Sequence, residues 1–249
     1  MTTEKEKQET RLVIIPTYNE LENIDKMLTK VLSLDPSFDV LIVDDGSPDG
    51  TAARVKLAKA THPTRIHLLE RTGKLGLGTA YITGFKWALD QGYDHIFEMD
   101  CDFSHNPDDL IRLNESLQQG ADVAVGSRYT RGGRLKNWPL LRILISFGAS
   151  VYVRLITFMP VKDPTAGFVA YKRKVLEQID FDKIKFIGYA FQIEMKFAAY
   201  QLGFKIKEIP ILFADREEGT SKMSGGIVKE AVWGVLQMRI WSFSNRYSQ

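Results

Sequence analysis

The sequence predicts an α/β fold, a mostly parallel sheet with helices on both faces, and two patterns indicate it. Short β-branched runs alternate with helical patterns through the first half of the chain, joined by short connections. No internal repeat, low-complexity tract or Pro/Gly-rich linker divides the 249 residues, a length that one large α/β domain can occupy. We therefore expect a disordered tail over residues 1–10 and a single domain over residues 11–249.

The strands and helices of the first half follow one another in regular order. Strands are predicted at 12–15, 40–43, 66–69, 95–99 and 122–125, with helices between them at 20–32, 51–60, 78–90 and 107–117. Asn106 is expected to cap the last of these helices, with Pro107 at its first position. Ligands of parallel sheets bind where the strands end, and the candidate motifs all follow strand ends.

The second half breaks this alternation. An apolar helix is predicted at 140–158, a strand at 167–171, a helix at 191–202, a strand at 205–213, a polar loop at 214–225 and a C-terminal amphipathic helix at about 227–243. Charged residues interrupt both apolar segments, and the longest charge-free stretch of the first is too short for a hydrocarbon core of roughly 30 Å.

The helix at 140–158 has an unusual distribution of polar residues. Arg142, Ser146, Ser150 and Arg154 recur every four residues and form one stripe, and the rest of the surface is apolar or small. The apolar arc is wider than one buried face needs. We therefore expect this helix, and less clearly the one at 227–243, to lie in a membrane interface.

The composition excludes several classes of protein. A formal net charge of +2 is too small to indicate a nucleic-acid binder. Cys101 is the only cysteine, so no intrachain disulfide can form and a reducing compartment is expected. The first ten residues are polar and charged, unlike a signal peptide.

Two carboxylates, Asp100 and Asp102, follow the fourth predicted strand with Cys101 between them. Side chains one residue apart at a strand end can both reach one divalent cation, and Mg²⁺ or Mn²⁺ prefers such oxygen ligands while keeping positions for water and phosphate. An isolated pair of this kind is more often two solvated loop carboxylates. Its place after an apolar strand, beside the other motifs, favours a metal site that binds a diphosphate.

A second acidic pair, Asp44 and Asp45, follows the second predicted strand in Val43-Asp-Asp-Gly-Ser47. A carboxylate there can accept hydrogen bonds from a ribose or a base. Asp-Gly-Ser also favours a turn. One aspartate can bind ligand while the other orients the turn, and the sequence leaves open which does which.

The other strand ends carry weaker signals. Pro16 is expected to end the first strand, and Tyr18, Asn19 and Glu20 follow it with an aromatic face and polar groups. Residues 73–78 combine glycines with Lys74 ahead of a helix, which suits close approach to a phosphate. This segment lacks the features of a P-loop and of the dinucleotide fingerprint, which argues against a nicotinamide oxidoreductase.

Basic residues lie on two later loops. Arg128 follows the fifth strand, with Arg131 and Arg134 beyond it, and Arg216 and Lys222 occupy the polar loop near the C-terminus. Arginines from separate loops can converge on phosphates. A surface salt-bridge role is equally compatible with any one of them.

Taken in order, the motifs 16–20, 43–47, 100–102, 126–129 and 163–168, with Arg216 and Lys222, resemble the dolichol-phosphate mannosyltransferases of glycosyltransferase family 2. The resemblance runs from about Arg11 to Lys222 and implies a GT-A fold. It implies that the nucleoside is held by Pro16, Tyr18, Glu20, Val43 and Asp45, with Lys74 in the same nucleotide-sugar site. Asp100, Cys101 and Asp102 would lie at the diphosphate, with the two carboxylates at the metal.

The resemblance also implies an activity. Asp102, Arg128, Arg216 and Lys222 would be catalytic, the basic residues binding phosphates of donor or acceptor. The expected reaction is an inverting transfer of mannose from GDP-mannose to a polyprenyl or dolichyl phosphate, dependent on Mg²⁺ or Mn²⁺. Some relatives carry glutamine where this chain has Ser104, which puts a third metal ligand there in doubt.

Alternatives remain at this point. The chain could transfer glucose or another sugar from a UDP-sugar to the same lipid, or act as a non-catalytic nucleotide-binding subunit. The expected location is peripheral, on the cytoplasmic face of a membrane, with attachment by surface helices or through a membrane-anchoring partner.

Overall fold

The computed structural model describes residues 9–215, 225–242 and 246–247, and only the backbone of residues 189 and 225–231. Seven strands form the central sheet in the order β3-β2-β1-β4-β7-β5-β8. Their bounds are β1 (Arg11–Thr17), β2 (Asp39–Asp44), β3 (Ile66–Glu70), β4 (His95–Glu98), β5 (Val123–Ser127), β7 (Val169–Lys172) and β8 (Ile206–Pro210). Only β7 runs antiparallel to its neighbours, so the predicted mostly parallel sheet is confirmed.

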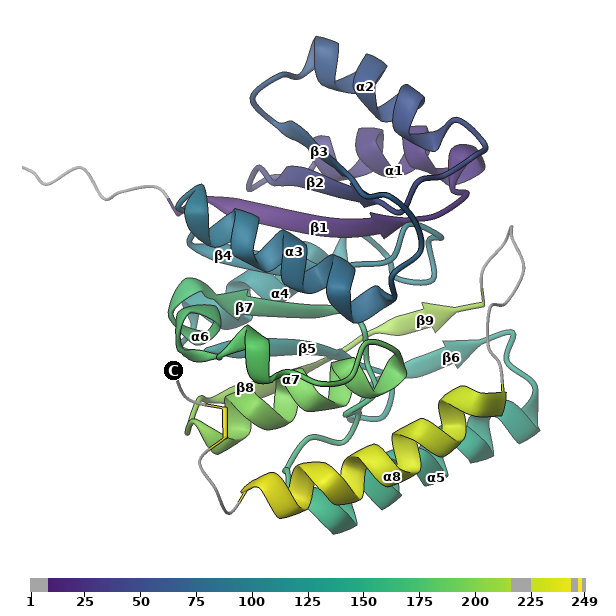
Figure 1. Ribbon diagram of the computed structural model, residues 1–249, viewed down its shortest axis with the longest axis vertical. Coiled ribbons are helices and arrows are strands. Elements are labelled where there is room, and N and C mark those ends of the chain that lie inside the picture. Colours follow the sequence, from purple (N-terminus) through teal and green to yellow (C-terminus); the bar gives the residue numbers. More distant parts are fainter. Residues whose placement is uncertain (1–8, 216–224, 243–245, 248–249) are drawn as a thin grey trace, which may run out of the picture.

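Helices cover both faces of this sheet (Figure 1). One layer contains α1 (Leu21–Leu32), α2 (Thr51–Thr61) and α4 (Asp109–Gln118), and the other contains α3 (Leu77–Asp90), α6 (Arg173–Gln178) and α7 (Tyr189–Gln201). Side chains of β1 alternate between the two layers, with Leu12 and Ile14 in one core cluster and Val13 and Ile15 in the other. Burial on both faces explains why the strand sequences are continuously apolar.

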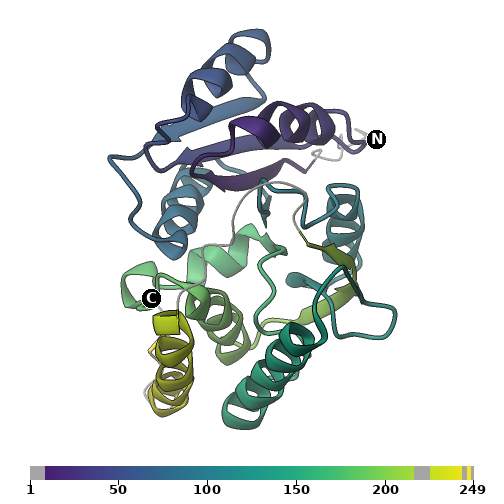
Figure 2. The same cartoon turned by 90° about the vertical axis from the view of Figure 1, so that its right-hand side faces the viewer.

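The remaining elements extend the molecule at one end. Helix α5 (Leu140–Thr157) and helix α8 (Gly225–Trp241) lie at the end opposite α2 (Figures 1 and 2), where the Tyr152 hydroxyl donates to the Val232 carbonyl at 2.9 Å. Strands β6 (Arg134–Lys136) and β9 (Leu212–Ala214) form a separate parallel pair. A short 3₁₀ helix, Phe181–Lys183, precedes α7.

Three helices end in the same motif. After α3, α4 and α7 the chain turns through Gly92, Gly120 and Gly203, with φ of +83°, +93° and +79°. In each, the next residue donates its N–H to a carbonyl five positions earlier: Tyr93 to Ala88, Ala121 to Ser116, and Phe204 to Ala199. This is the Schellman arrangement, which favours glycine because of the left-handed backbone. The three turns lead into β4, β5 and β8, at the sheet edge opposite the candidate site.

Some elements differ from the sequence prediction. The strand expected at 205–213 is two strands in different sheets, because Pro210 cannot donate a ladder hydrogen bond and the chain leaves the main sheet after it. Strand β1 continues through Pro16, which pairs with Val43, and ends at Thr17. The prediction that Asn106 caps this helix was wrong: α4 begins at Asp109 with Asp108 as its N-cap, because the chain makes one more turn first, in which Asn106 Oδ1 accepts from Asp108 N at 3.1 Å.

Candidate functional site

The predicted motifs meet at one edge of the sheet. Because β1, β2, β4 and β5 point the same way, their carboxyl ends bring Tyr18, Asp45, the segment 100–102 and Arg128 to the same side of the molecule. Arg216 and Lys222, also predicted to act here, lie outside the described residues.

Asp44 builds the turn after β2. Its carboxylate accepts hydrogen bonds from Thr17 Oγ1 at 2.8 Å, Ser47 N at 2.9 Å and Ser47 Oγ at 2.6 Å, and it is 1% exposed. These donors come from the end of β1 and from the turn itself. Of the two aspartates, Asp44 is therefore the one that orients the turn, a question that the sequence left open.

Asp45 is held by an arginine that sequence reasoning missed. Arg71, directly after β3, reaches Asp45 Oδ1 through Nε at 2.6 Å and Nη2 at 2.5 Å, and its Nη1 donates to Thr79 Oγ1 at 2.7 Å in α3. Burial raises the pKa of Asp45, and the Arg71 guanidinium opposes this shift. The ion pair fixes the Asp45 loop against the start of α3. The only sequence signal for this ion pair was that Arg71 is a basic residue directly after a strand.

The predicted nucleoside residues lie around this pair. Lys74, on the loop after β3, places Nζ 5.3 Å from the centre of the Tyr18 ring. Glu20 precedes α1; its backbone N–H donates to Thr51 Oγ1, and its Oε2 accepts from Asn23 at 3.0 Å. The Cys101 thiol is buried, which raises its pKa, and the Glu20 carboxylate adds to that shift. The ends of β1, β2, β3 and β4 are thus close neighbours here.

The two metal-ligand candidates differ in exposure. The Asp100 side chain is 42% exposed, whereas Asp102 is 8% exposed and its Oδ1 accepts from Ser104 N at 3.0 Å. Among the described residues no group of three His, Cys, Asp or Glu side chains is placed to hold a metal ion. Two carboxylates with hard oxygen donors suit Mg²⁺ or Mn²⁺ when phosphate and water complete the coordination. The residues present therefore fit a metal shared with substrate.

His105 is a second neighbour that sequence reasoning missed. Its Nδ1 lies 3.9 Å from Asp100 Oδ2, and its ring stacks on Phe168 at 4.9 Å and meets Phe213 edge-on at 5.1 Å. Burial lowers the pKa of His105 to about 4, against the opposing effect of the Asp102 charge. The imidazole is therefore neutral near pH 7 and adds no charge beside the carboxylates.

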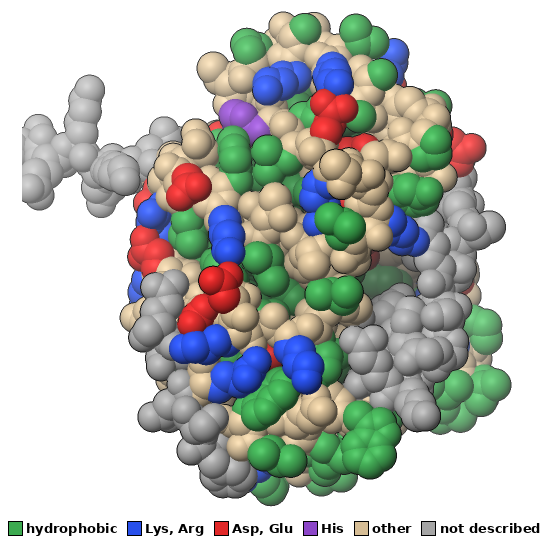
Figure 3. Space-filling model, viewed as in Figure 1, with side chains coloured by type: hydrophobic (Ala, Val, Ile, Leu, Met, Phe, Trp, Pro, Cys, Tyr) green, Lys and Arg blue, Asp and Glu red, His purple; other side chains and the backbone are tan. Residues whose placement is uncertain are grey.

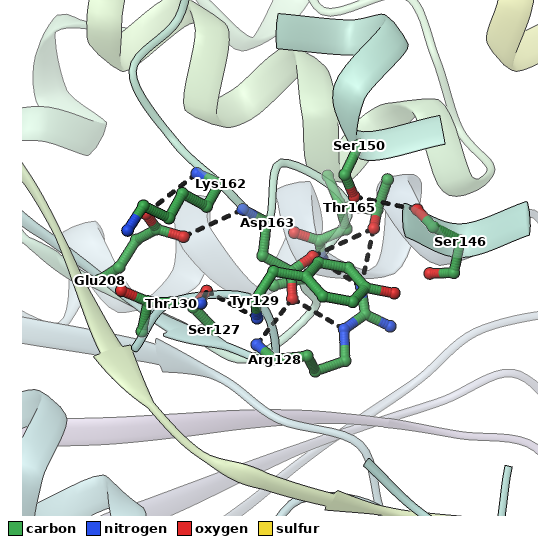
Figure 4. Close-up of polar contacts among 12 residues, drawn as sticks. Ser127, Arg128, Tyr129, Thr130, Ser146, Ser150, Lys162, Asp163, Thr165 and Glu208 are labelled. Atoms are coloured by element: carbon green, nitrogen blue, oxygen red, sulfur yellow. Dashed lines mark hydrogen bonds and ion pairs between the residues drawn. The ribbon is translucent and has the colours of Figure 1, made fainter. Parts of the chain in front are cut away.

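Arg128 is engaged by Asp163 (Figure 4). Its Nε donates to Oδ2 at 2.7 Å and its Nη2 to Oδ1 at 2.6 Å, and the backbone N–H of Arg128 also donates to Oδ2 at 2.9 Å. Nη2 bonds Thr165 Oγ1 at 2.7 Å as well. The Arg128 guanidinium lowers the pKa of Asp163 despite complete burial of that carboxylate. This bidentate pair joins the loop after β5 to the loop before β7.

Residues 214 and 215 lie near the metal candidates. Ala214 N, at the end of β9, donates to the Ser104 carbonyl at 3.2 Å, and Asp215 Oδ1 accepts from Arg142 Nη1 at 3.0 Å. The Arg142 guanidinium also lies 3.8 Å from the Trp138 ring centre. The first turn of α5 is thereby connected, through Asp215 and Ala214, to Ser104, whose N–H donates to Asp102. Arg131 and Arg134 are part of the β5–β6 connection and β6, and Arg134 is exposed.

Helix α5 presents its apolar side outward. Ser150 and Thr157 are 1% exposed and donate to the carbonyls of Ser146 and Val153, so much of the polar stripe faces the protein, while Arg154 is exposed. Large apolar side chains are exposed along α5 and α8: Leu140, Leu141, Leu144, Ile145, Phe147, Leu155, Val232, Trp233 and Ile240. Hydrophobic side chains gather at this end of the molecule in Figure 3. Among the described helices, α5 alone is long and apolar enough to span a membrane by length and composition.

Comparison with known proteins gives a consistent result. The family model described as "Glycosyl transferase family 2" matches residues 12–180. The chain is 46% identical over 229 residues to a polyprenol monophosphomannose synthase of Mycolicibacterium smegmatis, covering 92% of this chain and 86% of that protein. It is 47% identical over 236 residues to an undecaprenyl-phosphate mannosyltransferase of Micrococcus luteus, covering 95% of each.

Solved structures share the fold at lower identity. Glucosyl-3-phosphoglycerate synthase of Mycobacterium tuberculosis, in complex with Mn²⁺, UDP and phosphoglyceric acid, superposes with a TM-score of 0.69 at 17% identity, covering 93% of this chain and 79% of that one. This likeness confirms the sheet architecture expected from the sequence.

Proposed function

Because the chain belongs to glycosyltransferase family 2, we propose that it transfers mannose from GDP-mannose to the phosphate of a polyprenyl lipid. Relatives at 46% and 47% identity carry polyprenol-phosphate and undecaprenyl-phosphate mannosyltransferase names. The observation that carries the proposal is the connection between α5 and the Asp100–Asp102 segment. A helix with an exposed apolar side is linked by hydrogen bonds, through residues 214 and 215, to the end of a site suited to a metal-bound diphosphate, an arrangement that suits a lipid phosphate acceptor.

The donor would bind at the ends of β1 to β4. Tyr18, Glu20 and Asp45 would line the nucleoside side with Pro16 and Val43. Lys74, whose Nζ lies 5.3 Å from the centre of the Tyr18 ring, would join them from the loop after β3. Asp100 and Asp102 would hold Mg²⁺ or Mn²⁺, which supplies charge stabilisation to the departing nucleoside diphosphate. Cys101 is 3% exposed, so its side chain packs in the core and only its backbone would face the diphosphate.

The acceptor phosphate would attack the anomeric carbon in one displacement, so that the sugar–phosphate bond forms as the nucleoside diphosphate leaves with its bond electrons. A phosphate monoester has a second pKa of about 6, so it is mostly dianionic near neutrality and needs orientation more than a strong general base. We add Arg142 to the basic residues predicted to bind phosphate, because it lies at the start of α5 and its side chain is 37% exposed. Arg128, Arg216 and Lys222 remain predicted phosphate contacts, with Arg128 oriented by Asp163.

The exposed apolar surface of α5 and α8 supports peripheral attachment to a membrane. A helix with one apolar side can lie in the interface plane while its polar side faces the protein. We propose that this surface brings the acceptor lipid phosphate, still at the membrane surface, to the carboxyl edge of the sheet. Attachment to the cytoplasmic face, and any anchoring partner, belong to this proposal.

A transfer assay tests the function. The purified chain is incubated with a short polyprenyl phosphate and radiolabelled GDP-mannose, in parallel with UDP-glucose, with Mn²⁺, Mg²⁺ or EDTA. We expect metal-dependent label in the organic phase from GDP-mannose, none with EDTA, and none for Asp102→Asn. Asp90→Asn, at an exposed aspartate ending α3, is the matched control that keeps activity.

Each other outcome has a definite meaning. If only UDP-glucose gives labelled lipid, the proposed donor is wrong and the reaction class stands. GDP binding by calorimetry without transfer from any donor would indicate a non-catalytic nucleotide-binding subunit and reject the proposal. Normal turnover by Asp102→Asn would reject the metal assignment.

A further inference from the structure

Helix α7 carries polar side chains into the protein interior. Gln192 is 3% exposed and Lys196, one turn later on the same side, is 0% exposed. Lys196 Nζ donates to the Ala166 carbonyl at 2.7 Å and to Gln192 Oε1 at 3.3 Å, and Gln192 Nε2 donates to Glu98 Oε2 at 2.6 Å. A buried cation is costly unless hydrogen bonds and opposite charges compensate for the lost water.

Two buried carboxyl groups, Glu98 and Asp163, lie near the Lys196 ammonium. Burial lowers the pKa of Lys196 to about 8, while the nearby Glu98 and Asp163 carboxylates act to raise it. Both carboxylates are 0% exposed. Lys196 is thus a fully buried basic group that bonds Ala166 and Gln192 and feels two buried carboxylates.

The two carboxylates belong to opposite halves of the candidate site. Glu98 is the last residue of β4, two positions before Asp100. The Asp163 carboxylate accepts two hydrogen bonds from the Arg128 guanidinium, and the backbone N–H of Asp163 donates to Glu208 Oε1 at 3.0 Å (Figure 4). Ala166, whose carbonyl accepts a hydrogen bond from Lys196, lies on the same loop as Asp163. That loop leads directly into β7, and β7 lies between β4 and β5 in the sheet.

We propose that Lys196 is a positioning residue for the transfer reaction. Its buried ammonium fixes the loop 163–168, and Arg128 with it, relative to the strand that carries Asp100 and Asp102. Gln192 completes the connection by linking Lys196 to Glu98. The proposal rests on the proposed function, because positioning matters where a donor and an acceptor must meet in one geometry.

Kinetics of Lys196→Met test this role, with Gln201→Met at the exposed last residue of α7 as the control. We expect kcat to fall at least tenfold while the affinity for GDP with Mn²⁺, measured by calorimetry, changes less than threefold. The double variant Glu98→Gln/Lys196→Met removes the buried amine together with the acidic group that faces it through Gln192, and we expect it to recover at least threefold in kcat over Lys196→Met. A kcat within twofold of wild type in Lys196→Met would overturn the proposal.

Amide hydrogen exchange gives a readout independent of activity. In Lys196→Met, peptides covering 163–168 and 126–130 should exchange faster, whereas peptides covering 11–17 and 39–44 should not change. Faster exchange throughout the chain would show a merely structural role and overturn the proposal. If Lys196→Met does not fold, the double variant carries the exchange measurement, compared with Glu98→Gln alone.

The two proposals fail in different ways. A wild-type chain that transfers no sugar refutes the proposed function, and the exchange experiment still decides whether Lys196 holds the loop. An active wild type with unchanged Lys196→Met kinetics refutes the positioning role alone.

Discussion

Glu194 on α7 predicts a pH-dependent stability. Its carboxylate is 0% exposed, and Oε2 accepts the backbone N–H groups of Lys185 and Phe186, both at 2.9 Å. Burial raises the pKa of Glu194 from 4.5 to about 7, outweighing the two backbone donors, which act to lower it. The perturbation is Glu194→Gln, because a glutamine carbonyl can accept the same two hydrogen bonds without titrating.

The sign follows from proton linkage. The folded state binds the Glu194 proton more tightly than the unfolded chain, so this contribution to stability is complete below pH 4.5 and is lost as the pH rises through about 7. Between about pH 5 and about pH 8 the loss amounts to about 2.5 kcal/mol. For a chain of this length that corresponds to a difference in Tm of roughly 5–10 °C.

Denaturant unfolding of wild type and Glu194→Gln at both pH values measures the effect. We expect the wild type to lose about 2.5 kcal/mol more than the variant between about pH 5 and about pH 8, since other titrating groups are common to both. Glu22→Gln, the same change at an exposed position of α1, is the matched control. Equal pH slopes for wild type and Glu194→Gln would refute the reasoning.

Four further substitutions have defined outcomes. Lys74→Met should weaken GDP binding in the presence of Mn²⁺ about tenfold by calorimetry, and unchanged affinity would remove Lys74 from the donor site. Gly84→Ala should destabilise by about 1–3 kcal/mol in denaturant unfolding, because the new Cβ would lie 2.7 Å from Ile14 Cγ2, whereas Gly148→Ala, with no atom within 4 Å, should stabilise by about 1 kcal/mol. Leu144→Glu, on the exposed side of α5, should reduce pelleting with liposomes at least tenfold at unchanged Tm, and undiminished pelleting would exclude α5 as the membrane contact.

The alternating first half was predictable because each strand and helix carries its own periodicity. The order of short β-branched runs and helical patterns fixed the parallel sheet, and the position of Asp100 and Asp102 after β4 followed from it. The prediction at 205–213 was wrong about continuity, because an apolar run does not reveal that Ile206–Pro210 and Leu212–Ala214 pair with different partners. Which sheet a strand joins depends on contacts distant in sequence.

The residues that organise the site were less accessible to sequence reasoning. Asp44 and Asp45 are adjacent and chemically identical, and only their partners, Ser47 and Arg71, separate a turn residue from an ion pair. Gln192 and Lys196 lie in a segment predicted only as a helix, at 191–202, with no role for either side chain. Their burial depends on Glu98 and Asp163, which come from other parts of the chain.

The three Schellman turns at Gly92, Gly120 and Gly203 have a practical consequence. A Cβ added at any of them would meet no atom within 4 Å, so the surroundings are open, and all three lie where chains enter the sheet rather than where they leave it. Insertions are tolerated best at exposed turns of this kind. A fluorophore or a fused reporter attached at an exposed residue beside these glycines, with each glycine kept for its positive φ, would leave the carboxyl edge accessible to a bilayer.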